Sequence, residues 1–222
     1  MSEVTKTIPI VQNILNVNDE LAAQNMKLLD SKSIRALNIM ASPGSGKTSL
    51  ILRTIKVLSQ QIRFGVIEGD TAPVTIDADK VSGLHVPVVQ INTGGDCHLD
   101  ANMVRKGIDS LDLSQIDLLI IENVGNLVCP AAFRLGEHKN IVVASIPEGD
   151  DKPYKYPNIY RGLDALVLNK IDLLPYVDFN MDYFNAGISA LNPGIEIFQL
   201  SCKTGEGFDR WNQWIMEKVL ER

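Results

Sequence analysis

Residues 41–48 have the types and spacing of a loop that binds phosphate groups. They read ASPGSGKT and fit the pattern G-x-x-x-x-G-K-[ST], except that Ala41 stands in place of the first glycine. Glycines in such a turn let several backbone N–H groups point at one phosphate, and the lysine adds a full positive charge. The residues expected to bind the phosphates of a nucleotide are Gly44, Ser45, Gly46, Lys47, Thr48 and Ser49.

Two acidic residues are placed to hold the Mg²⁺ ion that accompanies such phosphates. Asp70 follows the segment 63–68, and Glu122 ends the almost wholly apolar segment 117–122, which has the form of a Walker B strand. Carboxylates at the carboxyl ends of strands beside a phosphate site can reach the ion directly or through water. Together with the Thr48 hydroxyl, Asp70 and Glu122 are therefore the expected ligands or holders of the Mg²⁺ waters.

Two points about this magnesium site follow from position alone. The spacing leaves Asp70, Asp77 and Asp79 open as ligands, and we expect Asp70 because it lies at the tip of a strand; Asp77 could instead cap the next helix. Gly125 comes three residues after Glu122, where its N–H can sense the γ-phosphate.

A second motif indicates which base is recognised. Residues 169–172 read NKID and follow the apolar segment 165–168. A carboxylate at Asp172 can accept hydrogen bonds from both N1–H and the 2-amino group of guanine, which adenine does not offer. The alternative is a charged turn, but the distance from the phosphate loop and a later S-x-K-T-G sequence favour guanine. The expected base-binding residues are Asn169, Lys170, Asp172, Ser201, Cys202 and Lys203.

Cys97, His98 and Cys129 could form a metal site. They come from two loops that each follow an expected parallel strand, 86–91 and 117–122, so they can meet at the edge of the sheet that carries the nucleotide. Thiolates and an imidazole suit Zn²⁺ or Ni²⁺ better than Mg²⁺ or Ca²⁺. Because the spacing matches no standard zinc pattern and cysteines are often buried small apolar residues, the residues alone leave both interpretations open.

The elements that must position these residues alternate between strand and helix along the chain. This order predicts an α/β fold with a mostly parallel sheet and helices on both faces. The expected strands are 36–40, 63–68, 86–91, 117–122, 141–146, 165–168 and 195–200, and the expected helices are 49–58, 99–111, 177–191 and a final one with Phe208, Trp211, Ile215 and Val219 on its inner face.

The N-terminal region should form an amphipathic helix that ends near residues 31–33. Its apolar residues recur at helical spacing, at Ile10, Ile14, Val17, Leu21 and Leu28. We expect this stripe to pack on the main sheet, and the alternative is a dimer or partner contact. The chain is therefore divided into an N-terminal extension, 1–32, and a nucleotide-binding domain, 33–222.

The overall composition excludes several classes of partner. The chain has 222 residues and a formal net charge of −6 without a basic run, which argues against nucleic acid. No apolar run approaches the roughly 20 residues of a membrane span. The three cysteines are few and far apart, and the N-terminus lacks a signal-peptide pattern, so we expect a cytoplasmic protein with no membrane partner.

Several longer blocks carry a resemblance to the HypB family, the GTPases that assist nickel insertion during maturation of [NiFe]-hydrogenase. The blocks that contain Cys97 and Cys129 are specific to this family and separate it from UreG, the related urease accessory GTPase. The full set is GSGKT at 44–48, EGD at 68–70, CHLDA at 97–101, ENVGNLVCP at 122–130, EGDDKP at 148–153 and NKID at 169–172.

The resemblance implies a P-loop NTPase fold of the SIMIBI type, and a homodimer promoted by GTP with a metal site of Cys97, His98 and Cys129 near its interface. It also implies a HypA-like nickel chaperone and the hydrogenase large-subunit precursor as partners. Some family members carry an N-terminal Cys-x-x-Cys-Gly-Cys motif or a histidine-rich tract; this sequence has neither, so we expect no N-terminal high-affinity nickel site and no storage role.

The function expected is a metal-regulated GTPase with GTP, Mg²⁺ and either Ni²⁺ or Zn²⁺ as cofactors. The sequence has no obvious glutamine to orient the attacking water, so we expect slow intrinsic hydrolysis. Three alternatives remain: a small-molecule kinase, which needs an acceptor pocket; a binding module in which GTP only holds a dimer together; and a GTPase that serves urease.

Overall fold

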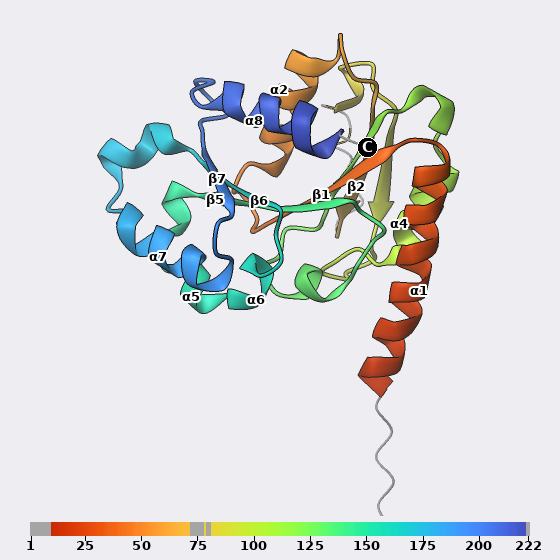
Figure 1. Cartoon of the computed structure of the whole chain (residues 1–222), viewed down its shortest axis with the longest axis horizontal. Coiled ribbons are helices and arrows are strands. Elements are labelled where there is room, and N and C mark those ends of the chain that lie inside the picture. Colours follow the sequence, from red (N-terminus) through yellow and green to blue (C-terminus); the bar gives the residue numbers. More distant parts are fainter. Residues whose placement is uncertain (1–9, 72–77, 79–80, 221–222) are drawn as a thin grey trace, which may run out of the picture.

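Seven strands form one sheet in a computed structural model that describes residues 10–71, 78 and 81–220 of the chain (Figure 1). The order across the sheet is β3-β2-β4-β1-β5-β6-β7, and every neighbouring pair is parallel. The strands are β1 (Arg35–Ala41), β2 (Phe64–Asp70), β3 (Val88–Asn92), β4 (Leu118–Glu122), β5 (Lys139–Ser145), β6 (Ala165–Asn169) and β7 (Glu196–Gln199). The mostly parallel α/β sheet expected from the sequence is confirmed.

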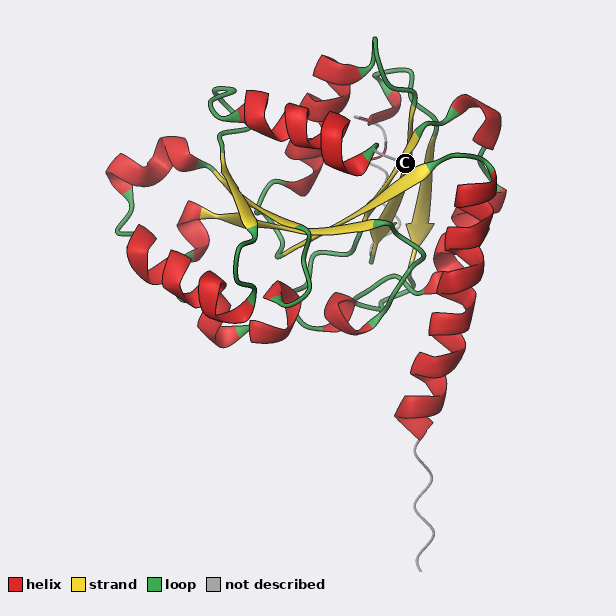
Figure 2. Cartoon of the chain, in the orientation of Figure 1, coloured by secondary structure: helices red, strands yellow, loops and turns green. Residues whose placement is uncertain are grey.

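The central strands are buried because helices cover both faces of the sheet (Figure 2). Such strands carry near-continuous apolar runs rather than an alternating pattern, as β4 and β6 do. Along β1, Leu37 and Ile39 belong to the apolar cluster on one face, whereas Ala36 and Met40 belong to clusters on the other. This alternation fixes the register of β1 in the middle of the sheet.

One face is covered by the helix that follows the phosphate loop and by the C-terminal helix. These are α2 (Lys47–Leu58) and α8 (Phe208–Trp214), which continues as a π-helical turn at Ile215–Val219. The inner stripe expected for the last helix is confirmed, because Phe208, Trp211, Ile215 and Val219 are all buried. The Trp211 indole also donates a 2.8 Å hydrogen bond to Thr54 Oγ1 on α2, which joins the two helices.

Two groups of helices share the opposite face. Near β6 lie α5 (Lys152–Lys155), α6 (Pro157–Tyr160) and α7 (Met181–Leu191), and near β2 and β4 lie α4 (Ala101–Asp109) and α1 (Ile10–Ser31) (Figure 1). Short 3-10 turns connect the elements at Leu113–Gln115, Cys129–Ala132, Ile146–Glu148 and Ile171–Tyr176. No helix within the described ranges combines the length and apolar character needed to cross a membrane.

The helix α1 forms where expected, but the side chains it buries are different. Ile14 and Val17 are 55% and 59% exposed, so the first part of the apolar stripe does not pack on the sheet. The buried positions are Asn18, Ala22, Asn25 and Leu29, which also recur at helical spacing. The prediction that the apolar stripe packs on the sheet is therefore wrong for Ile14 and Val17, whereas Leu28 does pack against the core. Two buried asparagines with hydrogen-bond partners on other segments decide how the helix is rotated.

Helix boundaries differ from the expected ones where side chains cap the backbone. The helix expected at 99–111 is Ala101–Asp109, because Asp100 accepts a hydrogen bond from Met103 N at 2.7 Å and so caps the first turn. The helix expected at 177–191 begins at Met181, because Asn180 caps it in the same way. The two short helices α5 and α6 were not expected, since each is a single turn.

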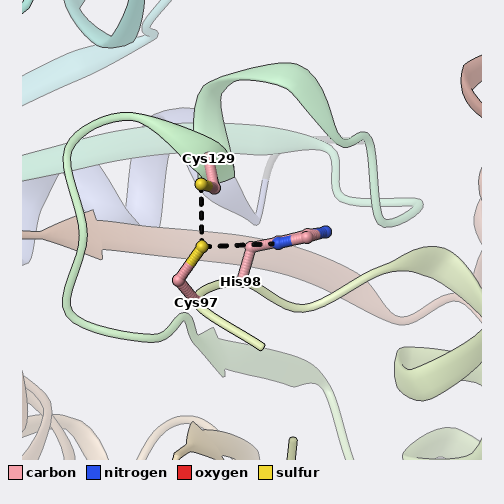
Figure 3. Close-up of side chains that lie close together, drawn as sticks. All are labelled: Cys97, His98 and Cys129. Atoms are coloured by element: carbon pink, nitrogen blue, oxygen red, sulfur yellow. Dashed lines mark hydrogen bonds between the residues drawn. The ribbon is translucent and has the colours of Figure 1, made fainter. Parts of the chain in front are cut away.

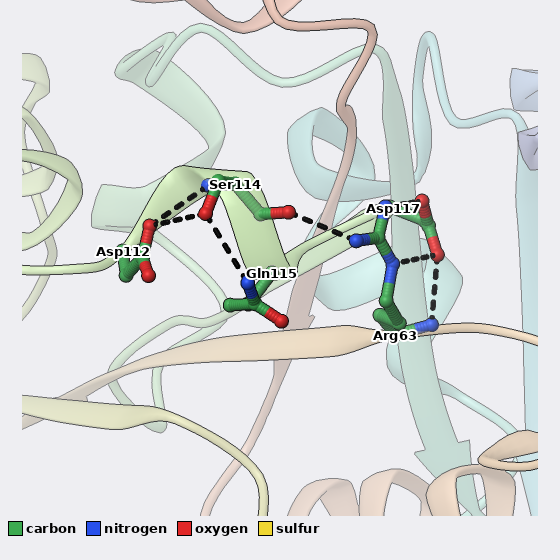
Figure 4. A network of polar contacts seen from close by, with 5 residues as sticks. All are labelled: Arg63, Asp112, Ser114, Gln115 and Asp117. Atoms are coloured by element: carbon green, nitrogen blue, oxygen red, sulfur yellow. Dashed lines mark hydrogen bonds and ion pairs between the residues drawn. The ribbon is translucent and has the colours of Figure 1, made fainter.

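A polar cluster ties β2 to β4 at the edge of the sheet opposite their carboxyl ends (Figure 4). The Arg63 guanidinium contacts Asp117 through Nε at 2.9 Å and through Nη2 at 2.6 Å, and donates to Ser114 O at 2.9 Å. Asp117 lies just before β4, so this ion pair fixes the start of the strand that carries Glu122 at its other end.

We expect Trp211→Ala to lower the free energy of unfolding by about 3–5 kcal/mol, because it leaves a large cavity between α2, α8 and the sheet and removes the hydrogen bond to Thr54. Urea denaturation measures this loss. Met216→Ala on the same C-terminal segment is the control, since Met216 is 36% exposed and should change the stability little. Equal effects of the two substitutions would contradict the packing described.

Candidate nucleotide and metal site

The residues expected to bind phosphate lie around one cavity of about 840 Å³ at the carboxyl ends of β1, β2 and β4. The ends of neighbouring parallel strands leave such a crevice in α/β sheets. Its lining includes Gly44, Gly46, Lys47, Thr48, Ser49, Glu68, Asp70, Cys97, Glu122, Gly125 and Lys170. The topology therefore brings together residues from distant parts of the sequence.

The phosphate loop has the backbone that its glycines allow. Gly44 and Gly46 have φ angles of 77° and 104°, in the left-handed region that other residues rarely adopt. A Cβ at Gly46 would lie 2.3 Å from Asn169 Nδ2, so the loop passes too close to its neighbour for any larger residue. Ser45 is fully buried, and its hydroxyl donates to Ser42 O at 3.0 Å, which closes the turn. The replacement of the first glycine by Ala41 is accommodated as the last residue of β1.

The magnesium residues also converge. Thr48 donates a 2.8 Å hydrogen bond to Glu122 Oε1, and Asp70 is the last residue of β2 at the same edge. Asp77 and Asp79, the alternatives to Asp70, lie outside the described residues. Sequence reasoning missed Glu68, which is paired in register with Glu122 across β2 and β4 and lines the same cavity. The sequence did hold a signal for Glu68, because it lies two residues before Asp70 on the same strand.

Of the residues expected to bind the base, all but the buried Ser201 line a second cavity of about 410 Å³, which shares Lys170 with the first. Asn169 holds its three neighbours together: its Nδ2 donates to Ser45 O at 2.9 Å, and its Oδ1 accepts from Lys170 N at 2.7 Å and from Cys202 N at 3.0 Å. Lys170 donates to Gly44 O at 2.6 Å, so its stem spans the two cavities. The Ser201 hydroxyl donates to Asp172 Oδ1 at 2.6 Å and thereby orients the carboxylate.

Arg53 supports the loop that would contact the base, and sequence reasoning missed it. From α2 its guanidinium donates to Cys202 O at 3.1 Å and to Thr204 O at 3.5 Å, and it lies 5.0 Å from the centre of the Phe208 ring. Burial raises the pKa of the Cys202 thiol to about 12, so this cysteine stays protonated at neutral pH. Cys202 packs against the apolar core and is not among the residues of the metal cluster.

Cys97, His98 and Cys129 form a cluster, as expected from the order of the strands (Figure 3). Their potential ligand atoms all lie within 4.8 Å of one another; the two sulfurs are 2.8 Å apart, and Cys97 Sγ is 4.0 Å from His98 Nδ1. The hydrogen bond with Cys97 raises the pKa of Cys129, and burial adds to this. Elsewhere in the described part of the chain no similar group of three His, Cys, Asp or Glu residues occurs.

The cluster fits a thiophilic metal ion. Two sulfurs bound at about 2.3 Å to a tetrahedral ion lie about 3.8 Å apart, so the two thiols, which are adjacent here, are within reach of one ion. The sulfur–nitrogen distance of 4.0 Å is already close to that required. The His98 ring is stacked on Phe133 with a centroid distance of 3.9 Å, and Asn126 Nδ2 donates to Cys97 O at 3.3 Å, so both loops hold the ligands in place. Phe133 and Asn126 were not expected from the sequence.

The two sites are adjacent, because Cys97 lines the phosphate cavity as well as the metal cluster. Gly125, expected near the γ-phosphate, packs against the phosphate loop: a Cβ on it would lie 3.2 Å from Pro43 Cα. Gly125 and Cys129 lie close together in sequence on one loop. Short segments of chain therefore connect the phosphate cavity with both thiols.

Comparisons with known proteins agree with this geometry. Residues 35–199 match the family model described as "CobW/HypB/UreG, nucleotide-binding domain". The hydrogenase maturation factor HypB of Azotobacter vinelandii is 46% identical over 95% of this chain and 69% of its own length. The chain belongs to the HypB family. It is accordingly a P-loop GTPase of the type that acts in hydrogenase maturation, and the P-loop fold expected from the sequence is confirmed.

Two further matches are to HypB of Helicobacter pylori, one of them a structure that contains nickel. A crystal structure of HypB from Helicobacter pylori in complex with nickel has a TM-score of 0.86 and 37% identity, and covers 91% of this chain and 94% of that one. The hydrogenase/urease maturation factor HypB of H. pylori strain J99 is 38% identical over 97% of this chain and 90% of its own length. The likeness to HypB proteins thus extends over the loops of Cys97 and Cys129.

Asn169→Ala removes the partner of three backbone groups at the junction of the phosphate and base loops. A buried polar group left unsatisfied costs about 1–3 kcal/mol, so we expect the free energy of unfolding to fall by about 2–3 kcal/mol and GDP affinity to fall tenfold or more. Calorimetric GDP titration and urea denaturation test this. Asn158→Ala, at an exposed position of α6, is the control. Unchanged GDP affinity would contradict the role of Asn169.

Proposed function

We propose that this GTPase uses its nucleotide state to set the affinity of the Cys97–His98–Cys129 cluster for nickel, and so promotes nickel insertion into [NiFe]-hydrogenase. The observation that carries the proposal is the position of Cys97, which lines the cavity of the phosphate loop and belongs to the metal cluster. The relative of known structure that binds nickel supports Ni²⁺ as the cargo, and Zn²⁺ suits the same ligands.

In this proposal the nucleotide is GTP, and its guanine is recognised by the NKID loop. Asp172 accepts from the base, Lys170 lies along it, and Asn169 holds the two loops in place. The Cys202 N–H already donates to Asn169, so of the base loop Lys203 is the better placed to donate to the guanine O6. The phosphates lie on the backbone N–H groups of Gly44, Ser45, Gly46, Lys47, Thr48 and Ser49.

The protein's part in hydrolysis is to hold charges around the γ-phosphate. Lys47 and Gly125 line the cavity, where the ammonium group and the backbone N–H would stabilise the charge that develops as water attacks in line. Mg²⁺, when held by Thr48 with Asp70 and Glu122 or their waters, supplies positive charge between the phosphates. No glutamine lines the cavity among the described residues, which is consistent with the slow turnover we expect.

Nucleotide and metal are coupled in the proposal through two short connections. Gly125 packs against Pro43 of the phosphate loop, where its N–H would contact the γ-phosphate, and the same loop carries Cys129. On the other side, Cys97 faces the phosphate cavity directly. Such coupling is reciprocal in binding free energy, so a metal ion must change the affinity for the nucleotide by the same factor.

The remaining parts of the proposal concern assembly. Three ligands leave a metal shell incomplete, and a homodimer promoted by GTP can complete it by bringing two clusters together. We propose a HypA-like nickel chaperone and the hydrogenase large-subunit precursor as partners in the cytoplasm, without nucleic acid or membrane. Residues 33–222 would form the GTPase domain and residues 1–32 an extension that includes α1.

A second candidate function is service to urease. It is favoured by one observation, the name of the H. pylori relative, which is a hydrogenase/urease maturation factor. Addition of the purified protein with GTP and Ni²⁺ to each apo-enzyme distinguishes the two. Phosphate release over many turnovers without any acceptor, meanwhile, separates a GTPase from a small-molecule kinase and from a module that only binds GTP.

Asp172→Asn should abolish most of the preference for guanine. Two charge-assisted hydrogen bonds to the base are lost, and each is worth about 1.5–3 kcal/mol, so we expect GDP affinity to fall about 100-fold or more. Xanthine has a carbonyl in place of the 2-amino group, and the new amide can donate to it, so affinity for xanthosine diphosphate should rise. Asp178→Asn, at a nearby exposed position, should change neither affinity. GDP binding that survives in the Asp172 variant would refute guanine recognition by this loop.

Nickel titration of the protein loaded with GDP or with a non-hydrolysable GTP analogue tests the coupling. We expect the two affinities to differ by about fivefold or more, and Cys97→Ala and His98→Ala each to weaken binding at least tenfold. His85→Ala is the matched control, because His85 is exposed and lies outside the cluster. If wild-type affinity is the same in both nucleotide states, the coupling is wrong even if the ligands are right.

A further inference from the structure

We propose that α1 is a clamp that sets the distance between the two metal-binding loops, with Asn18 and Asn25 as its positioning residues. The proposal deepens the function proposed above and rests on metal binding by Cys97, His98 and Cys129. Both asparagines are buried, at 6% and 1% exposure, although α1 lies at the margin of the sheet. Burying an amide costs free energy unless it is hydrogen-bonded. Each of these amides bonds to both loops, Asn18 through both of its polar atoms and Asn25 through Nδ2 alone.

Asn18 joins the loop of Cys97 to the segment after Cys129 through a single amide. Its Oδ1 accepts a hydrogen bond from Ala101 N at 2.8 Å, three residues after His98. Its Nδ2 donates to Arg134 O at 2.8 Å, five residues after Cys129. Because Ala101 and Arg134 are bonded to the two ends of one planar group, their separation is fixed by the amide itself.

Asn25 repeats the bridge two turns further along α1. Its Nδ2 donates to Ala101 O at 2.8 Å and to Leu135 O at 2.9 Å. The helix is held close at this point, since a Cβ at Gly136 would lie 2.5 Å from Asn25 Cβ and 2.7 Å from Ala22 O. Ala101 thus has both its N–H and its carbonyl bonded to α1, and residues 134–136 contact the helix through successive backbone groups.

A second chain of buried amides connects the same two loops through the sheet. Asn123 Oδ1 accepts from Leu99 N at 3.1 Å, and Asn123 Nδ2 donates to Asn38 at 3.3 Å. Asn38 Nδ2 donates to Asn140 Oδ1 at 2.8 Å, and Asn140 Nδ2 donates to Glu137 Oε1 at 2.7 Å. The other carboxylate oxygen of Glu137 accepts from Leu135 N at 2.7 Å. The loops are therefore joined on the sheet side by this chain and on the outer side by α1.

The two connections differ in how easily they can move. Asn38, Asn123 and Asn140 belong to or directly follow central strands, so the inner connection is part of the rigid sheet. The outer connection is a helix at the margin, and its first turns expose Ile14 and Val17. In this proposal the connection through α1, the more exposed of the two, sets the spacing of the two loops that carry the thiols.

The test is metal affinity in Asn18→Ala and Asn25→Ala, with Asn16→Ala as the control. Asn16 has the same residue type on the same helix but is exposed. Affinity for Ni²⁺ and Zn²⁺ is measured by competition with a chromophoric chelator, and Co²⁺ is added to record the thiolate-to-metal charge-transfer band. We expect each buried substitution to change metal affinity tenfold or more and to shift the Co²⁺ band, while Asn16→Ala changes neither.

A purely structural role for these asparagines would give a different pattern. GDP affinity and the melting temperature are measured on the same samples, because general unfolding would weaken GDP and metal binding together. The proposal requires GDP affinity to stay within about twofold of wild type in at least one of the two variants while metal affinity changes. If metal affinity and the Co²⁺ band match wild type in both variants, α1 does not position the ligands.

A metal-free measurement keeps this proposal distinct from the proposed function. Diamide takes two electrons and two protons from a pair of thiols and forms a disulfide, and its rate reports how often Cys97 and Cys129 are in contact. We expect the rate to fall severalfold in Asn18→Ala but not in Asn16→Ala. If the wild-type protein binds metal without needing Cys97, and the rate of diamide oxidation still falls in Asn18→Ala, the proposed metal function is wrong but the role of α1 as a clamp is supported. If the wild-type protein binds metal through Cys97, but substitution of Asn18 or Asn25 changes neither the diamide rate nor the metal affinity, only the clamp proposal is wrong.

Discussion

A buried amide side chain must find hydrogen-bond partners, and the buried asparagines at the carboxyl edge of this sheet find them in two segments at once. Asn169 bonds to the phosphate loop and the base loop, and Asn123 bonds to β1 and to the loop of Cys97. Asn18 and Asn25 do the same from α1. Each amide costs free energy if a partner is lost, so the loops that would bind nucleotide and metal are held at fixed separations without being part of the sheet.

The sequence was sufficient for the parts of the structure that depend on local pattern. The central strands are near-continuous apolar runs, and the phosphate and base motifs have fixed spacing, so the parallel sheet and the adjacent cavities follow from chain order. The pairing of Cys97 and His98 with Cys129 was also inferable, because both loops follow strands that meet at one edge. Their closeness in the structure agrees with that reasoning.

What could not be predicted depends on partners far away in the chain. The rotation of α1 follows from Asn18 and Asn25, whose bonds reach residues 76 to 116 positions away. The periodicity of the apolar residues alone predicted that Ile14 and Val17 face the core, and both are exposed instead. Arg53 and Phe133 belong to no motif for the same reason: their roles exist only once the fold has brought distant segments together.

The way the three candidate metal ligands are held would suit a site that releases its ion. A structural zinc site is closed by four ligands and contributes folding energy outright. Here the three candidate ligands come from two loops, and hydrogen bonds, each worth about 1 kcal/mol net where both partners are neutral, join those loops to α1 and to the strand ends. A coupling of about 1–3 kcal/mol between nucleotide and metal is of the same size as one or two such bonds. Loops held this way can therefore be moved by the hydrogen bonds that form or break around a γ-phosphate, whereas a site built into the sheet could not.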